Sequence, residues 1–233
     1  MTSKLLLYTS IAGLFLSLNV AAQQTSMNSQ TSGKIRGARF IPFPNYSGKP
    51  YLYDKFLVGE IELTEGTKIS NLGLSYSTYR DELIYYNPAI SAQIVIDKIS
   101  LNGFTIHELN GKSRHFRRQY CAEYTHDQSY FEVLSDGALA LLAYRKVNLE
   151  PCSTYYSKSG LAYAPAFSYF LYSREKGYIP INQTRNSLLS KFTKSDQKKV
   201  KKLLRKNGIV IADEPGFIKA WKLIEEYQIQ PIF

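Results

Sequence analysis

The chain of 233 residues is poor in the residue types that most often reveal chemistry. Two cysteines and three histidines exclude a disulfide-dense scaffold and give no recognisable zinc-site spacing. The sequence contains no H-E-x-x-H zinc motif, G-x-S-x-G nucleophile elbow, phosphate-binding P-loop or G-x-G-x-x-G dinucleotide motif. We therefore assign no catalytic residue, metal or cofactor from motifs, and any active site would have to be assembled in three dimensions.

Long apolar runs are also missing, except at the N-terminus. Lys4 precedes the uncharged, mostly apolar residues 5–20, and small residues follow at Val20, Ala21 and Ala22. This order is typical of a signal peptide over residues 1–22, cleaved between Ala22 and Gln23. The alternative, an uncleaved anchor, would need about 20 apolar residues, which this run does not reach. We expect an exported protein that is not an integral membrane protein.

Positive charge is concentrated in one segment of the chain. The formal net charge is +10, and removal of the signal peptide with Lys4 leaves +9. Residues 183–207 hold nine basic side chains and one acid, Asp196, so this segment alone carries +8. The high pI therefore describes a local patch, not a generally basic surface.

Residues 51–181 show the period-two pattern of a sheet with one wet face. Residues 57–63 and 72–77 alternate between the two faces, and the many tyrosines and phenylalanines suit β structure. Asn102-Gly103 and Asp136-Gly137 predict turns, which gives antiparallel hairpins of 94–101 with 104–109 and of 130–135 with 138–147. We expect eight to ten strands in a mainly β (α+β) fold, an antiparallel meander that forms a curled sheet, sandwich or barrel-like body.

The chain divides into four parts on this pattern. After the signal peptide we expect a flexible leader over residues 23–37, a β domain over 38–182 and a basic helical segment over 183–233 that packs on the β domain. Helices are predicted over 184–192, over 194–206 and from Asp213 onward. Thr193 with Asp196 has the spacing of an N-terminal cap, and Asn207-Gly208 is a C-terminal stop signal.

One stretch carries a resemblance. KPYLYDKFLVGEIELTEGTKISNLGLSYSTYRDELIYYN, residues 49–87, has an aromatic-Asp-x-Phe start, a glycine-bounded strand and a tyrosine-rich strand with an Asp-Glu turn. It resembles a module of uncharacterised exported β-rich proteins of Bacteroidota. The resemblance implies a periplasmic or secreted protein of a Gram-negative envelope, and it carries over no activity and no functional residue.

The densest group of reactive side chains is Cys121, Glu123, His126 and Asp127. One hypothesis makes this group a metal-binding or acid–base loop, as in an envelope hydrolase that uses His126 with Asp127 or Glu123. The alternative, which we favour, is a polar connection between two strands.

Cys121 and Cys152 predict one disulfide in an oxidising compartment. If residues 113–120, 130–135 and 138–147 are successive antiparallel strands, both cysteines lie at the same end of the sheet. They would then be separated by two strand spacings, roughly 9–10 Å, so the loops must fold over the middle strand for the sulfurs to meet. Two separate thiols are the alternative.

The helix expected over residues 194–206 is the strongest local feature. We favour a solvated helix face for its outer positions, and the alternative is a contact with an anionic envelope surface, such as lipid or lipopolysaccharide. Nucleic acid is not expected for an exported protein, and no aromatic residue lies within 194–206 to stack on bases. The candidate contacts are Lys198, Lys199, Lys201, Lys202, Arg205 and Lys206.

Three function hypotheses remain open. The first is a non-enzymatic binding or interaction scaffold with an unknown envelope partner, because catalytic motifs are missing and the sheet is rich in aromatics. The second is a carrier that holds an apolar ligand in an aromatic-lined β pocket. The third is the hydrolase described above.

Overall fold

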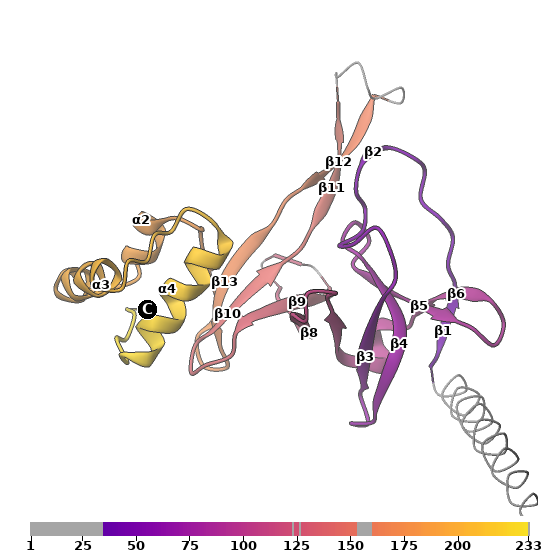
Figure 1. The fold of residues 1–233 in the computed structure, drawn as a ribbon, viewed down its shortest axis with the longest axis horizontal. Coiled ribbons are helices and arrows are strands. Elements are labelled where there is room, and N and C mark those ends of the chain that lie inside the picture. Colours follow the sequence, from indigo (N-terminus) through magenta and orange to yellow (C-terminus); the bar gives the residue numbers. More distant parts are fainter. Residues whose placement is uncertain (1–34, 123, 126, 153–159, 233) are drawn as a thin grey trace, which may run out of the picture.

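The computed structural model describes residues 35–122, 124–125, 127–152 and 160–232. Within them it confirms the mainly β fold, with one large antiparallel sheet, one small sheet and three α-helices (Figure 1). The large sheet contains β1 (Gly37–Arg39), β3 (Leu57–Leu63), β4 (Lys68–Ser77), β5 (Glu82–Asn87), β6 (Ala92–Ile96), β7 (Leu101–His107), β8 (Ser113–Tyr120), β9 (Gln128–Ser135), β10 (Ala140–Tyr144), β13 (Ser168–Ser173) and β14 (Gly177–Ile181). The small sheet contains β2 (Ser47–Gly48), β11 (Val147–Pro151) and β12 (Leu161–Pro165), and the helices are α2 (Arg185–Leu189), α3 (Lys194–Lys206), α4 (Glu214–Glu226) and the short 3-10 helix η1 (Lys98–Ser100).

The first eight strands of the large sheet curl around a filled core. Their order is β1-β6-β5-β4-β3-β7-β8-β9, and the sheet is not closed. Tyr76 on β4 and Tyr130 on β9 lie four strand spacings apart along the sheet, about 19 Å if it were flat. Their ring centroids are nevertheless 6.0 Å apart, and the stacked rings of Phe104 and Phe116 lie against them. The concave face is therefore packed with side chains.

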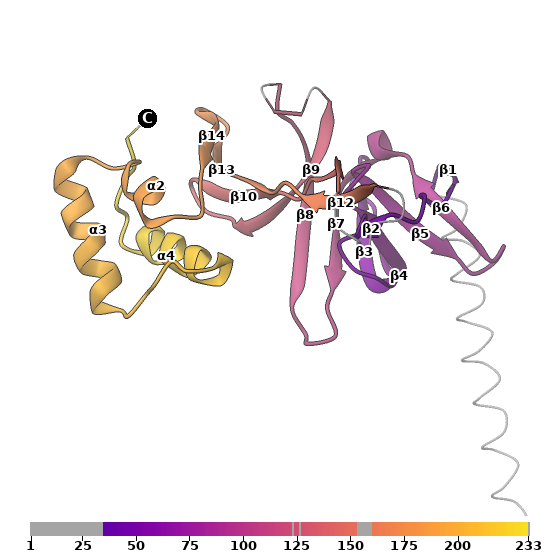
Figure 2. The same cartoon turned by 90° about the horizontal axis from the view of Figure 1, so that it is seen from above.

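The other end of the sheet carries the helices. Strands β10, β13 and β14 present Leu141 and Leu171 to a second core, which Phe217 and Trp221 of α4 complete. The opposite face of these strands packs Phe131 and Phe170 around Cys121. Figure 2 shows α2, α3 and α4 together at one end of the molecule, with the curled strands at the other end.

The predicted alternation is confirmed for β3 and only half confirmed for β4. Leu57, Gly59, Ile61 and Leu63 are buried as expected. Ser77, expected on the wet face of β4, is fully buried, and the segment that precedes β3 pairs beside this end of β4. Tyr51 forms a bridge with Ser77, whose hydroxyl also approaches the carbonyl oxygen of Pro50.

The predicted hairpin of 94–101 with 104–109 is wrong. Strand β6 pairs with β5 and β1, whereas β7 pairs with β3 and β8. Gly103 lies inside β7, where a Cβ atom would be 2.3 Å from the carbonyl oxygen of Phe116. The glycine is needed for close strand approach and not for a turn. The other predicted hairpin is confirmed as β9 with β10.

The helix boundaries follow their caps. The side chains of Thr184, Thr193 and Asp213 accept hydrogen bonds from backbone N–H groups at the starts of α2, α3 and α4. Beyond α3, Asn207 is the C-cap and Gly208 has φ +63°, a left-handed conformation that suits glycine. None of the described helices is long and apolar enough to span a membrane.

The predicted disulfide is not present: Cys121 and Cys152 are not bonded to each other. The third strand of the expected meander ends at Tyr144, and the chain then leaves the large sheet to form β11. Cys152 follows β11, beside Gly160, in the projecting arm of the small sheet (Figure 1). Cys121 directly follows β8, as predicted, and is buried against Phe131 and Phe170 of the large sheet, so the two cysteines do not share one end of a meander. Of the leader, residues 23–34 lie outside the described part, and Gly37 already belongs to β1.

Candidate functional site

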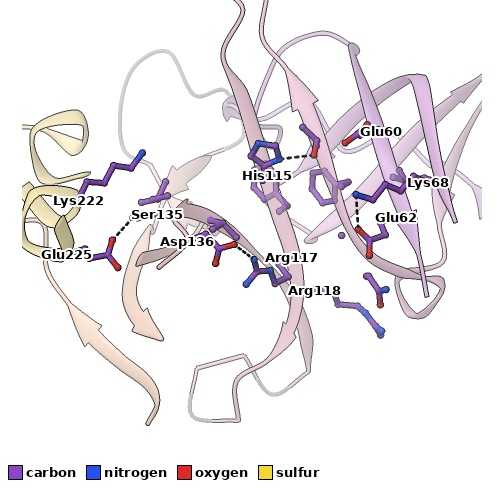
Figure 3. Close-up of a pocket in the computed structure, with 18 residues that line it drawn as sticks. Glu60, Glu62, Lys68, His115, Arg117, Arg118, Ser135, Asp136, Lys222 and Glu225 are labelled. Carbon is purple, nitrogen blue, oxygen red and sulfur yellow. Dashed lines mark hydrogen bonds and ion pairs between the residues drawn. The ribbon is translucent and has the colours of Figure 1, made fainter. Parts of the chain in front are cut away.

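An open groove of about 960 Å³ lies between the outer face of the curled sheet and α4 (Figure 3). We call it the polar groove. Strands β3, β4, β7 and β8 supply one wall, the end of β9 the floor, and α4 the other wall. Its charged and hydrogen-bonding side chains are Glu60, Glu62, Lys68, Asn102, Thr105, His115, Arg117, Arg118, Ser135, Asp136, Lys222 and Glu225.

Strand register arranges the first wall in two rows. In one row Glu60 lies beside Thr105, which lies beside His115. In the other, Glu62 lies between Lys68 and Gly103, and Gly103 lies beside Arg117. Because Gly103 has no side chain, a gap separates Glu62 from Arg117. Period-two alternation places all these side chains on the face opposite the aromatic core.

Most of these side chains have a partner within the groove. Lys68 lies 3.8 Å from Glu62, and Arg117 donates to Asp136 at 2.9 Å; Glu60 accepts from Ser70, outside the groove lining, at 3.2 Å. These ion pairs are solvent-exposed, so each contributes little to stability. Charges of both signs therefore remain available to a polar partner.

The α4 wall joins the turn between β9 and β10. Ser135 donates a 2.7 Å hydrogen bond to Glu225, whose other carboxylate oxygen lies against Gly137. A Cβ atom at position 137 would be 2.1 Å from that oxygen, so the turn sequence fits the helix closely. Burial raises the pKa of Glu225, and the Ser135 hydrogen bond and nearby Lys222 only partly offset this effect.

The nearest approach to a catalytic pair is Thr105 with His115. The Thr105 hydroxyl and His115 Nδ1 are 2.9 Å apart. A nucleophile and its base normally have a third group that orients the base. Among the described contacts, none places a carboxylate on the other ring nitrogen of His115. The pair therefore resembles a cross-strand hydrogen bond more than a triad.

The polar loop predicted as a possible hydrolase site is only partly described. Glu123 and His126 lie outside the described residues. Cys121 is buried, and its carbonyl oxygen accepts from the N–H groups of Tyr124 and Thr125. Asp127 accepts from the N–H group of Gln128 at 2.8 Å. Within the described residues, no group of three His, Cys, Asp or Glu side chains is placed to hold a metal.

The predicted anionic-surface contacts come together on α3. Lys198, Lys199, Lys201, Lys202, Arg205 and Lys206 are all exposed. Val200, Leu203 and Leu204 on the opposite side are buried against the other helices. Among the described ion pairs, Lys199 with Asp196 at 2.7 Å is the one formed within this helix.

A buried charge network joins the curled sheet to the helical end. Glu132 on β9 accepts 2.6 Å hydrogen bonds from both Arg114 and Arg145, and Arg145 also donates to Glu214 of α4. Burial alone would raise the pKa of Glu132, but the two guanidinium groups outweigh it and hold this pKa below its usual value. Sequence reasoning missed this network, although an isolated acid between Phe131 and Val133 is a signal that a buried partner is required.

A second buried carboxylate closes the turn between β4 and β5. Asp81 accepts from the Tyr76 hydroxyl at 2.6 Å and from Lys98 at 2.8 Å. Burial raises its pKa, and Lys98 and Tyr76 lower it only in part. Asp81 has φ +58°, a left-handed conformation that aspartate tolerates better than most residues. Its contacts are structural, since they tie the turn to η1 and β9.

Sequence reasoning identified the basic side chains of α3 but not the polar groove, whose members come from six separate elements. Comparison with known protein families, curated proteins and solved structures found no match for this chain.

Proposed function

We propose that this chain is an exported envelope protein that acts as a non-enzymatic binding scaffold, with the polar groove as its main recognition surface and an anionic envelope surface as a further contact of α3. The observation that carries the proposal is the contrast between the two faces of the curled sheet. The concave face is filled by aromatic and aliphatic side chains, and the opposite face lines an open groove with charges of both signs.

This arrangement favours a macromolecular partner over a small one. A small-molecule site is usually concave, mostly apolar and furnished with a few convergent polar groups. The polar groove is wide. Its ion pairs, Lys68 with Glu62 and Arg117 with Asp136, are exposed to solvent. Such a surface suits a polar protein or glycan that replaces exposed ion pairs with contacts of its own.

The two alternatives have less support. A carrier needs space among the aromatic side chains, but the rings of Tyr76, Phe104, Phe116 and Tyr130 pack within 4.5–6.0 Å of one another. A hydrolase of this kind needs a nucleophile, a base and a third group that orients the base. Thr105 and His115 supply the nucleophile and the base but not the orienting group.

Site-specific photo-crosslinking in the native envelope tests the scaffold. A crosslinking amino acid is placed singly at Glu62, Arg117 or Lys222 in the groove, and at exposed Lys55 or Lys112 as matched controls on other surfaces. We expect discrete crosslinked products from the groove positions and none from the controls. Equal crosslinking at both sets would contradict the groove, and ester or phosphoester hydrolysis that is lost in a His115→Ala or His126→Ala variant would contradict the non-enzymatic assignment.

A further inference from the structure

We propose that the outer side of α3 docks on the phosphate groups of an anionic phospholipid bilayer, with the helix axis parallel to the bilayer plane. This inference rests on the proposed function, because it specifies the partner of the α3 contact named there, and it uses a different surface from the polar groove. We call this surface the basic face, and it consists of Lys194, Lys198, Lys199, Lys201, Lys202, Arg205 and Lys206.

Helical geometry makes the basic face continuous. With 100° between successive residues, the seven basic positions cover an arc of about 160°. Within this arc the helix contributes one other residue, Ser195, and no acid. The thirteen residues of α3 extend for about 20 Å. The face is therefore a cationic strip that presents one sign of charge along its whole length.

The remaining charges of the helix leave this strip almost uncompensated. Asp196 lies about 60° outside the arc, and it caps the helix through Thr193 and pairs with Lys199 at the edge of the arc. The other six basic side chains have no ion pair among the described contacts of the chain. Seven positive charges on one helix repel one another, and phosphate groups would relieve that repulsion.

The position of α3 allows a flat partner to reach the strip. Figures 1 and 2 both show α3 as the outermost of the three helices, at the end of the molecule farthest from β1 and β6. A convex helix at the end of a protein can contact a planar surface along its whole length. A nucleic acid is not the expected partner, because the chain is expected to be exported and residues 194–206 contain no aromatic side chain to stack on bases.

The mode of contact is electrostatic and not insertive. An interfacial helix inserts through an exposed apolar face, but Val200, Leu203 and Leu204 are 0–8% exposed because they pack in the helical core. The strip therefore contacts phosphates from outside. We choose phospholipid over lipopolysaccharide because its phosphates lie at the surface, within reach of lysine side chains, with no polysaccharide in front of them.

Vesicle co-sedimentation of the exported, full-length mature protein tests the proposal. The probes are vesicles of phosphatidylglycerol with phosphatidylethanolamine, vesicles of phosphatidylcholine, lipopolysaccharide aggregates and a short DNA duplex, all at low ionic strength. The variant K198Q/K199Q/K201Q/K202Q removes four charges from the strip. The control R36Q/R39Q/K55Q/K112Q removes four charges from exposed positions of the β body.

We expect the wild type and the control to bind the phosphatidylglycerol vesicles and not phosphatidylcholine, and 0.5 M NaCl to release them. Each lysine near an anionic bilayer strengthens binding about fivefold, so the strip variant should bind more than a hundredfold more weakly. The same circular dichroism spectrum in both variants would show that folding is unchanged.

Four results would overturn the proposal: no binding of the wild type at low salt, equal weakening in both variants, tighter binding to lipopolysaccharide or DNA than to the vesicles, or binding that persists at 0.5 M NaCl. The groove crosslinks do not involve α3. Failure of vesicle binding would therefore remove the α3 contact but leave the polar groove as the proposed recognition surface. Loss of the crosslinks would remove the groove but leave the membrane contact.

Discussion

Replacement of Glu132 by glutamine should destabilise the whole protein. Glu132 is the centre of the buried network, with its side chain 4% exposed and Arg145 3% exposed. Arg114 approaches from β8 and Arg145 from the end of β10, and both guanidinium groups donate to the same carboxylate. Glutamine has nearly the same shape, so Glu132→Gln removes the charge without leaving a cavity.

The expected loss of stability comes from the arginine charges that lose the Glu132 carboxylate as a partner. Breaking a buried ion pair by removing one partner costs about 3–5 kcal/mol, because the other charge is left uncompensated. Two features place Glu132→Gln near the lower limit: the amide oxygen still accepts one hydrogen bond, and Arg145 keeps Glu214. A loss of about 3 kcal/mol corresponds to a fall of about 6–12 °C in the midpoint of thermal unfolding for a chain of this size.

Urea unfolding of the mature protein at pH 7, followed by circular dichroism, measures this loss. The matched control is Asp54→Asn, which removes an exposed ion pair with Lys49 and should change the free energy of unfolding by less than about 1 kcal/mol. The combined variant E132L/R114M/R145M replaces the buried charges with apolar groups and should recover much of the stability. A cost below about 1 kcal/mol for Glu132→Gln would refute the reasoning.

The same carboxylate predicts a pH dependence. The pKa of Glu132 is lower in the folded than in the unfolded protein, so its stabilising contribution is complete above about pH 4.3, the unfolded value. The contribution is lost as the pH falls through the lower folded pKa. Wild-type stability should therefore fall more steeply with acid than that of Glu132→Gln. Parallel pH profiles below pH 4.3 would contradict this assignment.

Three further predictions use the same unfolding assay or thiol labelling. Asp81→Asn should lower the free energy of unfolding by less than about 1 kcal/mol, because asparagine tolerates the left-handed backbone and can still accept a hydrogen bond. Asp81→Ala should lower it by about 2–4 kcal/mol, and equal effects of the two variants would contradict this. Gly103→Ala should destabilise by several kcal/mol through its clash with the neighbouring strand, whereas Gly66→Ala, in open space, should cost about 1 kcal/mol. Labelling of the denatured, unreduced protein should modify both Cys121 and Cys152, and in the native protein the less buried Cys152 should react first; no label on the denatured protein would show a disulfide.

Local patterns predicted the parts of this fold that depend on near neighbours. The alternation of residues 57–63 gave the correct buried face of β3, and Thr193 with Asp196 gave the correct start of α3. Both signals act within a few residues, through side-chain direction in a strand and through backbone N–H groups at a helix start. Tertiary structure does not easily override either of them.

Glycine positions show where local patterns fail. Asn110-Gly111 and Asn102-Gly103 look the same in sequence, but only Gly111 is in a turn, with φ +82°. Gly103 instead faces the backbone of β8, a contact that the sequence around it does not reveal. Likewise, Ser77 alternates as a solvent-facing residue but is buried where Pro50 and Tyr51 lie beside it. Long-range contacts determine the environments of Gly103 and Ser77, so the residues next to them in sequence could not predict these environments.

The two candidate surfaces differ in the same way. The basic face of α3 was predictable because its seven charges lie within thirteen consecutive residues, and helical geometry alone gathers them on one side. The polar groove was not, because Glu62, Arg117 and Lys222 become neighbours only after four strands are aligned and α4 has docked on them. Ser135 with Glu225 fixes that docking, since the hydrogen bond joins residues 90 positions apart. A surface that exists only in the assembled fold depends on the stability of that fold. The groove should therefore lose its crosslinks in any variant that weakens the packing of α4. The basic face, in contrast, should keep its charge pattern as long as α3 remains helical.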